Sequence, residues 1–315
     1  MKLILLTRFH SQHQGAPLVA RLMQAAEAQG HQLLVINPAE VVQAFNSATA
    51  AESCPVLWRG QPFPVADLTL PIARWDDDHT WQIAQSLEAW GYPVTMHQRV
   101  PLGDNITMAR LLARSNIPAP RSWVMAHPSQ LSVVMPELHF PLLMRSRYGG
   151  SGRRVAVVQH SGEAYTHAQY LATGGQPFLV QDLPEPYGED VRVLMLGDKP
   201  VASIKRMAPA GFVRPKEEGN PLCSVSPLSA EETRIAQAAA RLYGAPFCAV
   251  SMLRSKLKGP LLLEVSRVPA ITEMESVTGQ DLAAAIMAHV AALGALHAAR
   301  KKAPSTVVPM SGKRA

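Results

Sequence analysis

A glycine-rich segment flanked by arginines could bind an anion. In PLLMRSRYGGSGRRVAVV, residues 141–158, an apolar strand pattern leads into Gly149, Gly150, Ser151 and Gly152. Glycines let backbone N–H groups approach a phosphate without side-chain obstruction, and the serine adds a donor. A β-hairpin turn that needs glycine for positive φ angles explains the same letters. The segment therefore predicts a phosphate-covering loop only together with other residues.

Charged residues on two further predicted strands could face the same ligand. Asp190 and Arg192 form an Asp-x-Arg pair in EDVRVLML, and arginine is planar, charged and able to bind phosphate or carboxylate bidentately. Glu264 lies near the end of the apolar strand GPLLLEVS, where a buried carboxylate needs a cation or a hydrogen-bond partner. An ion pair of Glu264 with Arg192 or Arg206 is the alternative to a ligand site.

Metal and thiol chemistry have weaker support elsewhere. The acidic cluster DDDH at residues 76–79 could bind a metal, but aspartates that cap a helix and favour its dipole explain it better. Cys54, Cys223 and Cys248 form neither a zinc pattern nor a disulfide framework. Their spacing indicates a reducing compartment.

The elements that must hold these residues alternate between strands and helices. In the first 95 residues the patterns predict a strand, helix, strand, strand and helix at 2–6, 16–30, 31–38, 67–73 and 76–94. This order favours a parallel sheet with a right-handed crossover. Beyond the first domain the patterns predict a helix at 105–116, strands on either side of the glycine loop, a strand at 176–183, a hairpin at 189–207 with Gly197 and Asp198 at its tip, a helix at 229–244, a strand at 259–269 and a helix at 281–299.

The amino-acid composition indicates a globular protein but does not distinguish between functional classes. The 315 residues are 47% hydrophobic and 17% charged, which is typical of globular proteins. The net charge of +6 favours anionic partners such as nucleotides or acidic peptides, whereas nucleic-acid binding through the basic tail is the weaker interpretation. No stretch has the features of a signal peptide or approaches a membrane span, so we expect a cytoplasmic protein with no membrane partner.

The order and spacing of these parts resemble the ATP-grasp fold, and within it the RimK type of ribosomal-protein glutamate ligase. The resemblance covers nearly the whole chain and rests on MKLILLTR, LPIAR, LLARSNIPAPRS, FPLLMRS, YGGSG, FLVQDL, EDVRVLMLGDKPVASIKR, GPLLLEV and VTGQDLAAAI. It implies a mixed α/β and α+β fold. The implied parts are a Rossmann-like N-terminal domain at 1–95, a central ATP-grasp lobe with the glycine-rich lid at 96–178, a C-terminal ATP-grasp lobe at 179–299 and a disordered basic tail at 300–315.

The resemblance also implies a chemistry and a set of site residues. In this family ATP and Mg²⁺ lie between two lobes, and an acyl phosphate made from a carboxylate is attacked by an amine to give an amide. The residues that match are Gln181, Asp182 and Leu183 for the adenine-facing hinge, Gly149 to Gly152 for the phosphate lid, Asp190 and Arg192 for the cleft, Arg206 and Arg214 for the phosphates or substrate, and Glu264 for magnesium.

Several positions depart from the family pattern. Asn105 and Arg145 stand where the family has nucleotide-binding lysines, and Ser251 stands for a metal-binding aspartate. The Asn-x-x-Pro-Gly end of the metal strand has become SRVPA, with Ser266 for the asparagine and Ala270 for the glycine. Magnesium prefers oxygen ligands that include one or two carboxylates. We therefore expect a weakened metal site.

Arginines could take over the role of the metal. Five of them lie in or beside the supposed site, so that the cleft would hold an anion by guanidinium groups: Arg145, Arg147, Arg153, Arg154 and Arg267. Solvated surface positions are the alternative for Arg153 and Arg154.

Two functional hypotheses follow. The first is a RimK-like protein with a degenerate catalytic site, kept as a nucleotide- or anion-binding regulatory partner of an active relative or acceptor protein. The second is an active ATP-dependent carboxylate–amine ligase that adds glutamate or another amino acid to a protein, peptide or cofactor. The resemblance further implies a homo-oligomer.

Overall fold

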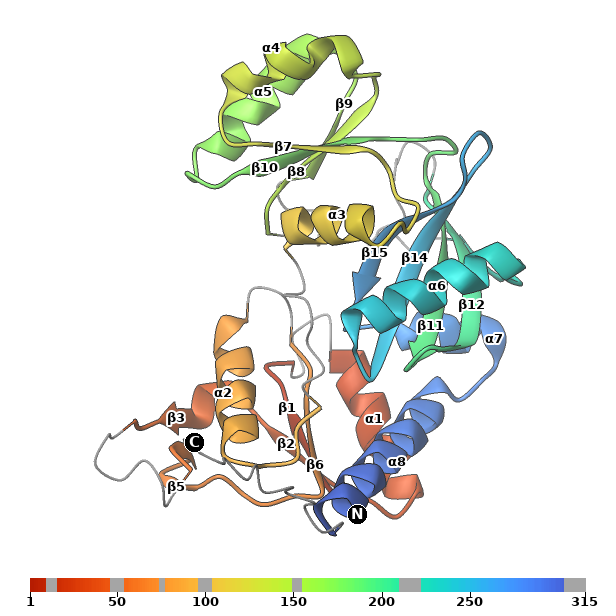
Figure 1. Cartoon of the computed structure of the whole chain (residues 1–315). Coiled ribbons are helices and arrows are strands. Elements are labelled where there is room, and N and C mark those ends of the chain that lie inside the picture. Colours follow the sequence, from red (N-terminus) through yellow and green to blue (C-terminus); the bar gives the residue numbers. More distant parts are fainter. Residues whose placement is uncertain are drawn as a thin grey trace, which may run out of the picture.

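The computed structural model describes residues 1–9, 16–45, 54–73, 77–95, 104–148, 155–209 and 222–302, with only the backbone for 300–302. Three lobes are visible in Figure 1: an N-terminal lobe at the bottom, a central lobe at the top and a C-terminal lobe on the right. Helix α3 (Asn105–Arg114) lies between the central and C-terminal lobes. Its buried Met108 and Leu112 join the core of the C-terminal lobe.

The N-terminal lobe contains the predicted parallel sheet. Its strand order is β2-β1-β6, and α1 carries the chain from β1 to β2 before ending next to Gly30, whose φ is 70°. Asp77 caps α2 by accepting from the backbone N–H of Thr80 at 3.3 Å, as the capping interpretation of the acidic cluster predicted. A small antiparallel sheet, β3-β4-β5, was not predicted. The bounds are β1 Lys2–Leu6, α1 Ala16–Ala28, β2 Gln32–Ile36, the short helix η1 Pro38–Glu40, β3 Val41–Gln43, β4 Val56–Trp58, β5 Gln61–Pro62, β6 Leu68–Pro71 and α2 Asp78–Ala89.

The central lobe is a four-stranded antiparallel sheet in the order β7-β10-β8-β9, with α4 and α5 packed on one face (Figure 1). Strands β8 and β9 are the two strands predicted on either side of the glycine-rich segment, and residues 149–154 themselves lie outside the described residues. The bounds are β7 Ser122–Met125, η2 Pro128–Gln130, α4 Leu131–Val134, η3 Met135–Glu137, β8 Leu142–Ser146, β9 Val155–Val158, α5 Ser161–Ala172 and β10 Phe178–Asp182.

The C-terminal lobe is a five-stranded antiparallel sheet in the order β13-β12-β11-β14-β15. The predicted hairpin is confirmed as β11 and β12, with Gly197 in a left-handed conformation (φ 57°) at the tip. Helix α6 covers one face, begins with a capping box at Ser229 and ends at the left-handed Gly244. The bounds are β11 Glu189–Leu196, β12 Lys199–Met207, β13 Leu222–Val225, α6 Ala230–Tyr243, β14 Phe247–Ser255, β15 Gly259–Ser266, α7 Ile271–Thr278 and α8 Leu282–Lys302.

Helix α8 returns to the N-terminal lobe and lies beside α1 (Figure 1). Its buried Ile286, Met287 and Val290 share one core with β1, α1, β6 and the C-terminal sheet. The prediction that no stretch approaches a membrane span was wrong by length and composition, because Leu282–Ala299 is long and apolar enough to cross a bilayer. A third of that window is buried in the protein, and the apolar face packs against the first lobe. The predicted tail begins inside this helix at 300, and the residues after 302 lie outside the described ones.

Candidate functional site

The start of α3 meets the end of β8, and this contact positions several predicted site residues. The backbone N–H of Asn105 donates to Arg147 O at 2.9 Å, and Asp104 and Tyr148 form an isolated antiparallel bridge. Asp104 caps α3 by accepting from the N–H groups of Ile106 and Thr107 at 3.0 and 3.1 Å. The helix start and the strand end are thereby fixed as one unit.

Asp104 also holds Arg147. The guanidinium donates from Nε and Nη2 to Asp104 Oδ2 at 3.1 and 2.8 Å, and Asp104 is only 4% exposed. Burial alone would raise the pKa of this carboxyl, but the hydrogen bonds from Arg147 and Thr107 outweigh it and lower the pKa below its ordinary value. Arg147 therefore serves the junction between α3 and β8.

The two residues that stand where the family has lysines, Asn105 and Arg145, differ in charge and in their contacts. Asn105 directs its amide at the strand, because Nδ2 donates to Ser146 O at 3.0 Å. Arg145 is buried at the end of β8, opposite Leu179 of β10 and Val155 of β9. The positive charge of the second lysine position is thus kept and that of the first is absent.

Asp190 and Arg206 form a buried ion pair across the hairpin of β11 and β12. The guanidinium donates from Nε and Nη2 to the two carboxylate oxygens at 2.8 and 2.6 Å, and the two side chains are 7% and 4% exposed. Glu273 of α7 adds a second carboxylate, 3.7 Å from Arg206 Nη1, and accepts from Cys223 Sγ at 3.1 Å. Burial would lower the pKa of Arg206, but Asp190, Glu273 and Glu264 outweigh it and raise the pKa above its ordinary value. Arg206 is therefore held within the protein by carboxylates.

The predicted metal positions lie together on two neighbouring strands. Ser251 of β14 is opposite Glu264 of β15 and Arg192 of β11, and Ser266 is opposite Ala249. Ser266 Oγ donates to Val268 O at 3.1 Å and accepts from Val268 N at 3.3 Å, so it is used to shape its own loop. Ser251 Oγ is buried and has no hydrogen-bond partner among the described residues.

Compared with the magnesium site that the resemblance implies, these positions keep fewer charged ligands. Glu264 is the one carboxylate that this set retains, and Mg²⁺ in such sites usually has one or two carboxylates beside the phosphates. Across the described ranges, no three His, Cys, Asp or Glu side chains are grouped closely enough to hold a metal ion. Strands β14 and β15 place the hydroxyl oxygens of Ser251 and Ser266 and the carboxylate of Glu264 at the predicted metal positions. The total negative charge of these side chains is lower than in the family pattern, because Ser251 replaces an aspartate.

The predicted adenine-facing hinge links the central and C-terminal lobes. Gln181 donates from Nε2 to Ser122 Oγ at 2.9 Å, and the backbone N–H of Asp182 donates to Arg121 O at 2.9 Å. Asp182 also forms an ion pair with Lys258 of the β14–β15 turn, with 3.5 Å between Oδ2 and Nζ. These contacts hold Gln181 and Asp182 in place between the central and C-terminal lobes.

Several predicted site residues lie outside the described part of the chain, and two described residues have contacts that the sequence did not predict. Gly149, Gly150, Ser151, Gly152, Arg153, Arg154 and Arg214 lie outside the described residues. Glu273 was not predicted as a site residue, although it lies in the first turn of α7, the helix that follows the altered SRVPA segment. Arg267 was expected in the cleft, and it stacks on Trp81 of α2 with its Cζ 4.8 Å from the ring centroid.

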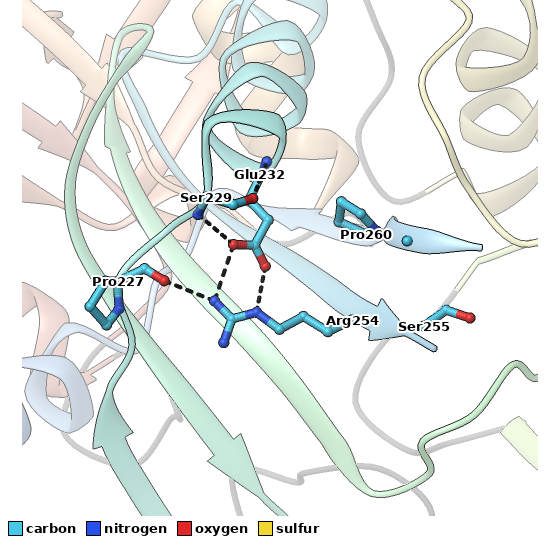
Figure 2. Close-up of a pocket in the computed structure, with 7 residues that line it drawn as sticks. Pro227, Ser229, Glu232, Arg254, Ser255 and Pro260 are labelled. Atoms are coloured by element: carbon cyan, nitrogen blue, oxygen red, sulfur yellow. Dashed lines mark hydrogen bonds and ion pairs between the residues drawn. The ribbon is translucent and has the colours of Figure 1, made fainter. Parts of the chain in front are cut away.

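A separate pocket of about 450 Å³ lies on the C-terminal lobe (Figure 2). Its lining includes Arg254, which donates to both oxygens of Glu232 and to Pro227 O, while Glu232 and Ser229 form the cap of α6. The charged groups in Figure 2 are thus satisfied by one another, and none of the predicted site residues lines this pocket.

Comparisons with known proteins identify the fold. Among solved structures, the chain is similar to the ATP-grasp ligase PsnB complexed with minimal precursor, with a TM-score of 0.70, 15% identity and coverage of 92% of this chain and 98% of that one. It is also similar to the VanG D-Ala:D-Ser ligase from Enterococcus faecalis, with a TM-score of 0.67, 17% identity and coverage of 93% and 99%. The fold is therefore that of ATP-grasp ligases.

The family follows from the sequence match. Residues 103–290, more than half of the chain, match the model of the RimK-like ATP-grasp domain. A "Probable alpha-L-glutamate ligase" of Marinomonas sp. (strain MWYL1) is 27% identical over 276 residues, which cover 86% of this chain and 90% of that protein. One of the same name from Stenotrophomonas maltophilia (strain K279a) is 27% identical over 308 residues, covering 92% and 98%. This chain belongs to the RimK-like ATP-grasp family.

Proposed function

We propose that this chain binds a nucleotide between its central and C-terminal lobes and turns ATP over poorly. The hinge at Gln181 to Leu183 and the buried Arg145 are the described residues that would hold the nucleotide. The observation that carries the proposal is the set of residues around Glu264, where Ser251 lies opposite it and Ser266 is bonded to its own loop. In phosphoryl transfer almost all of the catalysis comes from positioning and charge stabilisation, so the missing ligands should cost several kcal/mol of transition-state stabilisation.

A protein with such a site would act by binding a nucleotide and a protein partner rather than by catalysis. It would present a nucleotide-dependent surface to an active relative or to an acceptor protein, with an acidic small molecule or peptide as an alternative ligand. The net charge of +6 supports an anionic ligand in general terms. A cytoplasmic location and a homo-oligomeric assembly are further parts of this proposal.

An active ligase is the second candidate, and two observations favour it. Glu264 is retained on β15, and the match to relatives named as alpha-L-glutamate ligases covers 98% of the length of one of them. In this case the chain would activate a carboxylate as an acyl phosphate, and an amine would attack it to form an amide and release phosphate. Glutamate would be the first amino acid to test.

Hydrolysis of ATP by the unmodified protein and by Glu264→Ala discriminates the two candidates. If the metal site is weak, the two proteins hydrolyse ATP at the same low rate with and without Mg²⁺. Asp198→Ala is the matched control, because Asp198 lies in an exposed ion pair with Arg241 at the tip of the β11–β12 hairpin. A Mg²⁺-dependent rate that falls to background only in Glu264→Ala contradicts the proposal and supports the ligase.

A further inference from the structure

Arg267 joins two lobes at the edge of the candidate site. It follows directly after Ser266 at the end of β15, and its guanidinium lies over the ring of Trp81 on α2 of the N-terminal lobe. Stacking on tryptophan fixes the plane of a guanidinium and leaves its edge able to donate hydrogen bonds. The arginine is thereby held in one orientation beside a position where the family has a metal ligand.

This guanidinium has no carboxylate to neutralise it in the described part of the chain. None of the described acidic side chains forms an ion pair with Arg267, and its buried Nε has no hydrogen-bond acceptor there. Burial lowers the pKa of Arg267 to about 10, which still leaves it charged at neutral pH. A partly buried cation in this state gains free energy from any anion that reaches it.

A second buried arginine lies nearby and comes from the central lobe. Burial raises the pKa of Tyr243 at the end of α6, and the charges of Arg145 and Arg267 act in the opposite direction. The two guanidinium groups thus act on the same hydroxyl, which donates to Met108 Sδ of α3. The charge of Glu264 also acts on this hydroxyl and raises its pKa.

We propose that Arg267, together with Arg145, holds a phosphate group of the nucleotide without a metal ion. The inference rests on the proposed nucleotide site and adds the residue and the charge that make it independent of Mg²⁺. Guanidinium groups bind phosphate by paired, charge-assisted hydrogen bonds, and Arg267 is placed one residue after a lost metal ligand.

Calorimetry with ADP in the presence of EDTA tests this role. Compared with the unmodified protein, Arg267→Gln should bind ADP about tenfold more weakly or worse, because a charge-assisted hydrogen bond contributes about 1.5–3 kcal/mol. Arg267→Lys keeps the charge but not the paired geometry and should fall between the two. Adenosine, which has no phosphate, should bind all three proteins equally. Arg241→Gln is the matched control, since Arg241 is exposed and paired with Asp198.

The outcomes separate this inference from the proposed function. If the unmodified protein binds ADP neither with nor without Mg²⁺, the proposed function is wrong. If it binds ADP only when Mg²⁺ is present, the metal-independent role of Arg267 is wrong. If it binds ADP in EDTA and Arg267→Gln binds equally well, the proposed function stands and the role of Arg267 is wrong. A second measurement uses only the unmodified protein, in case the variants fail to fold. Phenylglyoxal should modify Arg267 more slowly when ADP is bound but not when adenosine is bound, and equal modification rates in both would overturn the assignment.

Discussion

Asp190→Asn should lower the free energy of unfolding by about 3 kcal/mol. The substitution keeps the shape of the side chain and removes the charge that both Nε and Nη2 of Arg206 contact at 2.8 and 2.6 Å. Removing one partner of a buried ion pair typically costs about 3–5 kcal/mol, because the other charge is left buried without compensation. The lower end applies here, since Glu273 remains 3.7 Å from Arg206 and the new amide still offers one acceptor.

Urea unfolding at pH 7, followed by circular dichroism, measures this loss. Asp198→Asn is the control, because the ion pair of Asp198 with Arg241 is 3.2 Å long and both side chains are at least half exposed. Such surface pairs contribute about 0–1 kcal/mol. The double variant Asp190→Leu/Arg206→Met removes both charges and should recover part of the loss, as replacing a buried pair by apolar side chains often does.

The result also bears on function. If Asp190→Asn costs no more than Asp198→Asn, the ion pair is not formed in solution. Arg206 would then be available to face a ligand, as the sequence analysis expected, and the description of Arg206 as a residue held by carboxylates would be refuted.

Three further outcomes are expected. Asp104→Asn should lower the free energy of unfolding at pH 7 by about 1–2 kcal/mol, because the contact with Arg147 is weakened. Since the pKa of Asp104 is lowered in the folded protein, the difference between the two proteins should begin to shrink as pH falls towards about 4 and should vanish only once pH has fallen through the lowered pKa, which urea titrations over pH check. Iodoacetamide should alkylate Cys223 slowly at pH 9 in the folded protein and rapidly in urea, because burial and the hydrogen bond to Glu273 raise its pKa to about 12, and mass spectrometry checks this. Ile286→Ala should cost about 2–5 kcal/mol in urea unfolding because Ile286 of α8 is fully buried in the core, whereas Leu296→Ala, at a position of the same helix that is 57% exposed, should cost less than about 0.5 kcal/mol.

The strands and helices of this chain could largely be predicted from apolar periodicity and from end signals. Gly30 and Gly244 both take positive φ angles where helices end, and Ser229 forms the capping box that starts α6. The tip of the β11–β12 hairpin at Gly197 was also predicted from its letters. These features depend on residues close in sequence, so local propensity decides them.

The carboxylate partner of Arg206 depends on the register of the β11–β12 hairpin, which could not be predicted from the sequence. At the hairpin tip Leu196 pairs with Lys199, and a register that continued unchanged would place Lys205 opposite Asp190. An irregularity between Leu194 and Met195 shifts the pairing by one residue, so that Asp190 faces Arg206 instead. A shift of one residue moves every following side chain to the other face of the sheet. The sequence could thus predict the hairpin but not which cation the aspartate meets.

Contacts between lobes were beyond prediction for a different reason. Arg267 of the C-terminal lobe meets Trp81 of the N-terminal lobe, and this contact depends on how the two lobes dock. Arg206 and Glu273 meet within the C-terminal lobe but are far apart in the sequence. The pattern of the family suggested that arginines gather in the cleft. The structure adds the partners of these arginines: Arg206 and Arg147 are held by carboxylates, while Arg267 is stacked on an aromatic ring.

The reduced metal site is the central claim, and one assay tests it most directly: Mg²⁺-dependent ligation of glutamate, followed by ATP consumption, in the unmodified protein and in the triple variant Asn105→Lys/Ser251→Asp/Ser266→Asn. The three changes are made together because residues that act as a unit are strongly non-additive. We predict that the unmodified protein stays at background at every Mg²⁺ concentration and that the triple variant gains a dependence on Mg²⁺. Robust ligation by the unmodified protein, abolished by Glu264→Ala, would contradict the account and establish the chain as a working ligase.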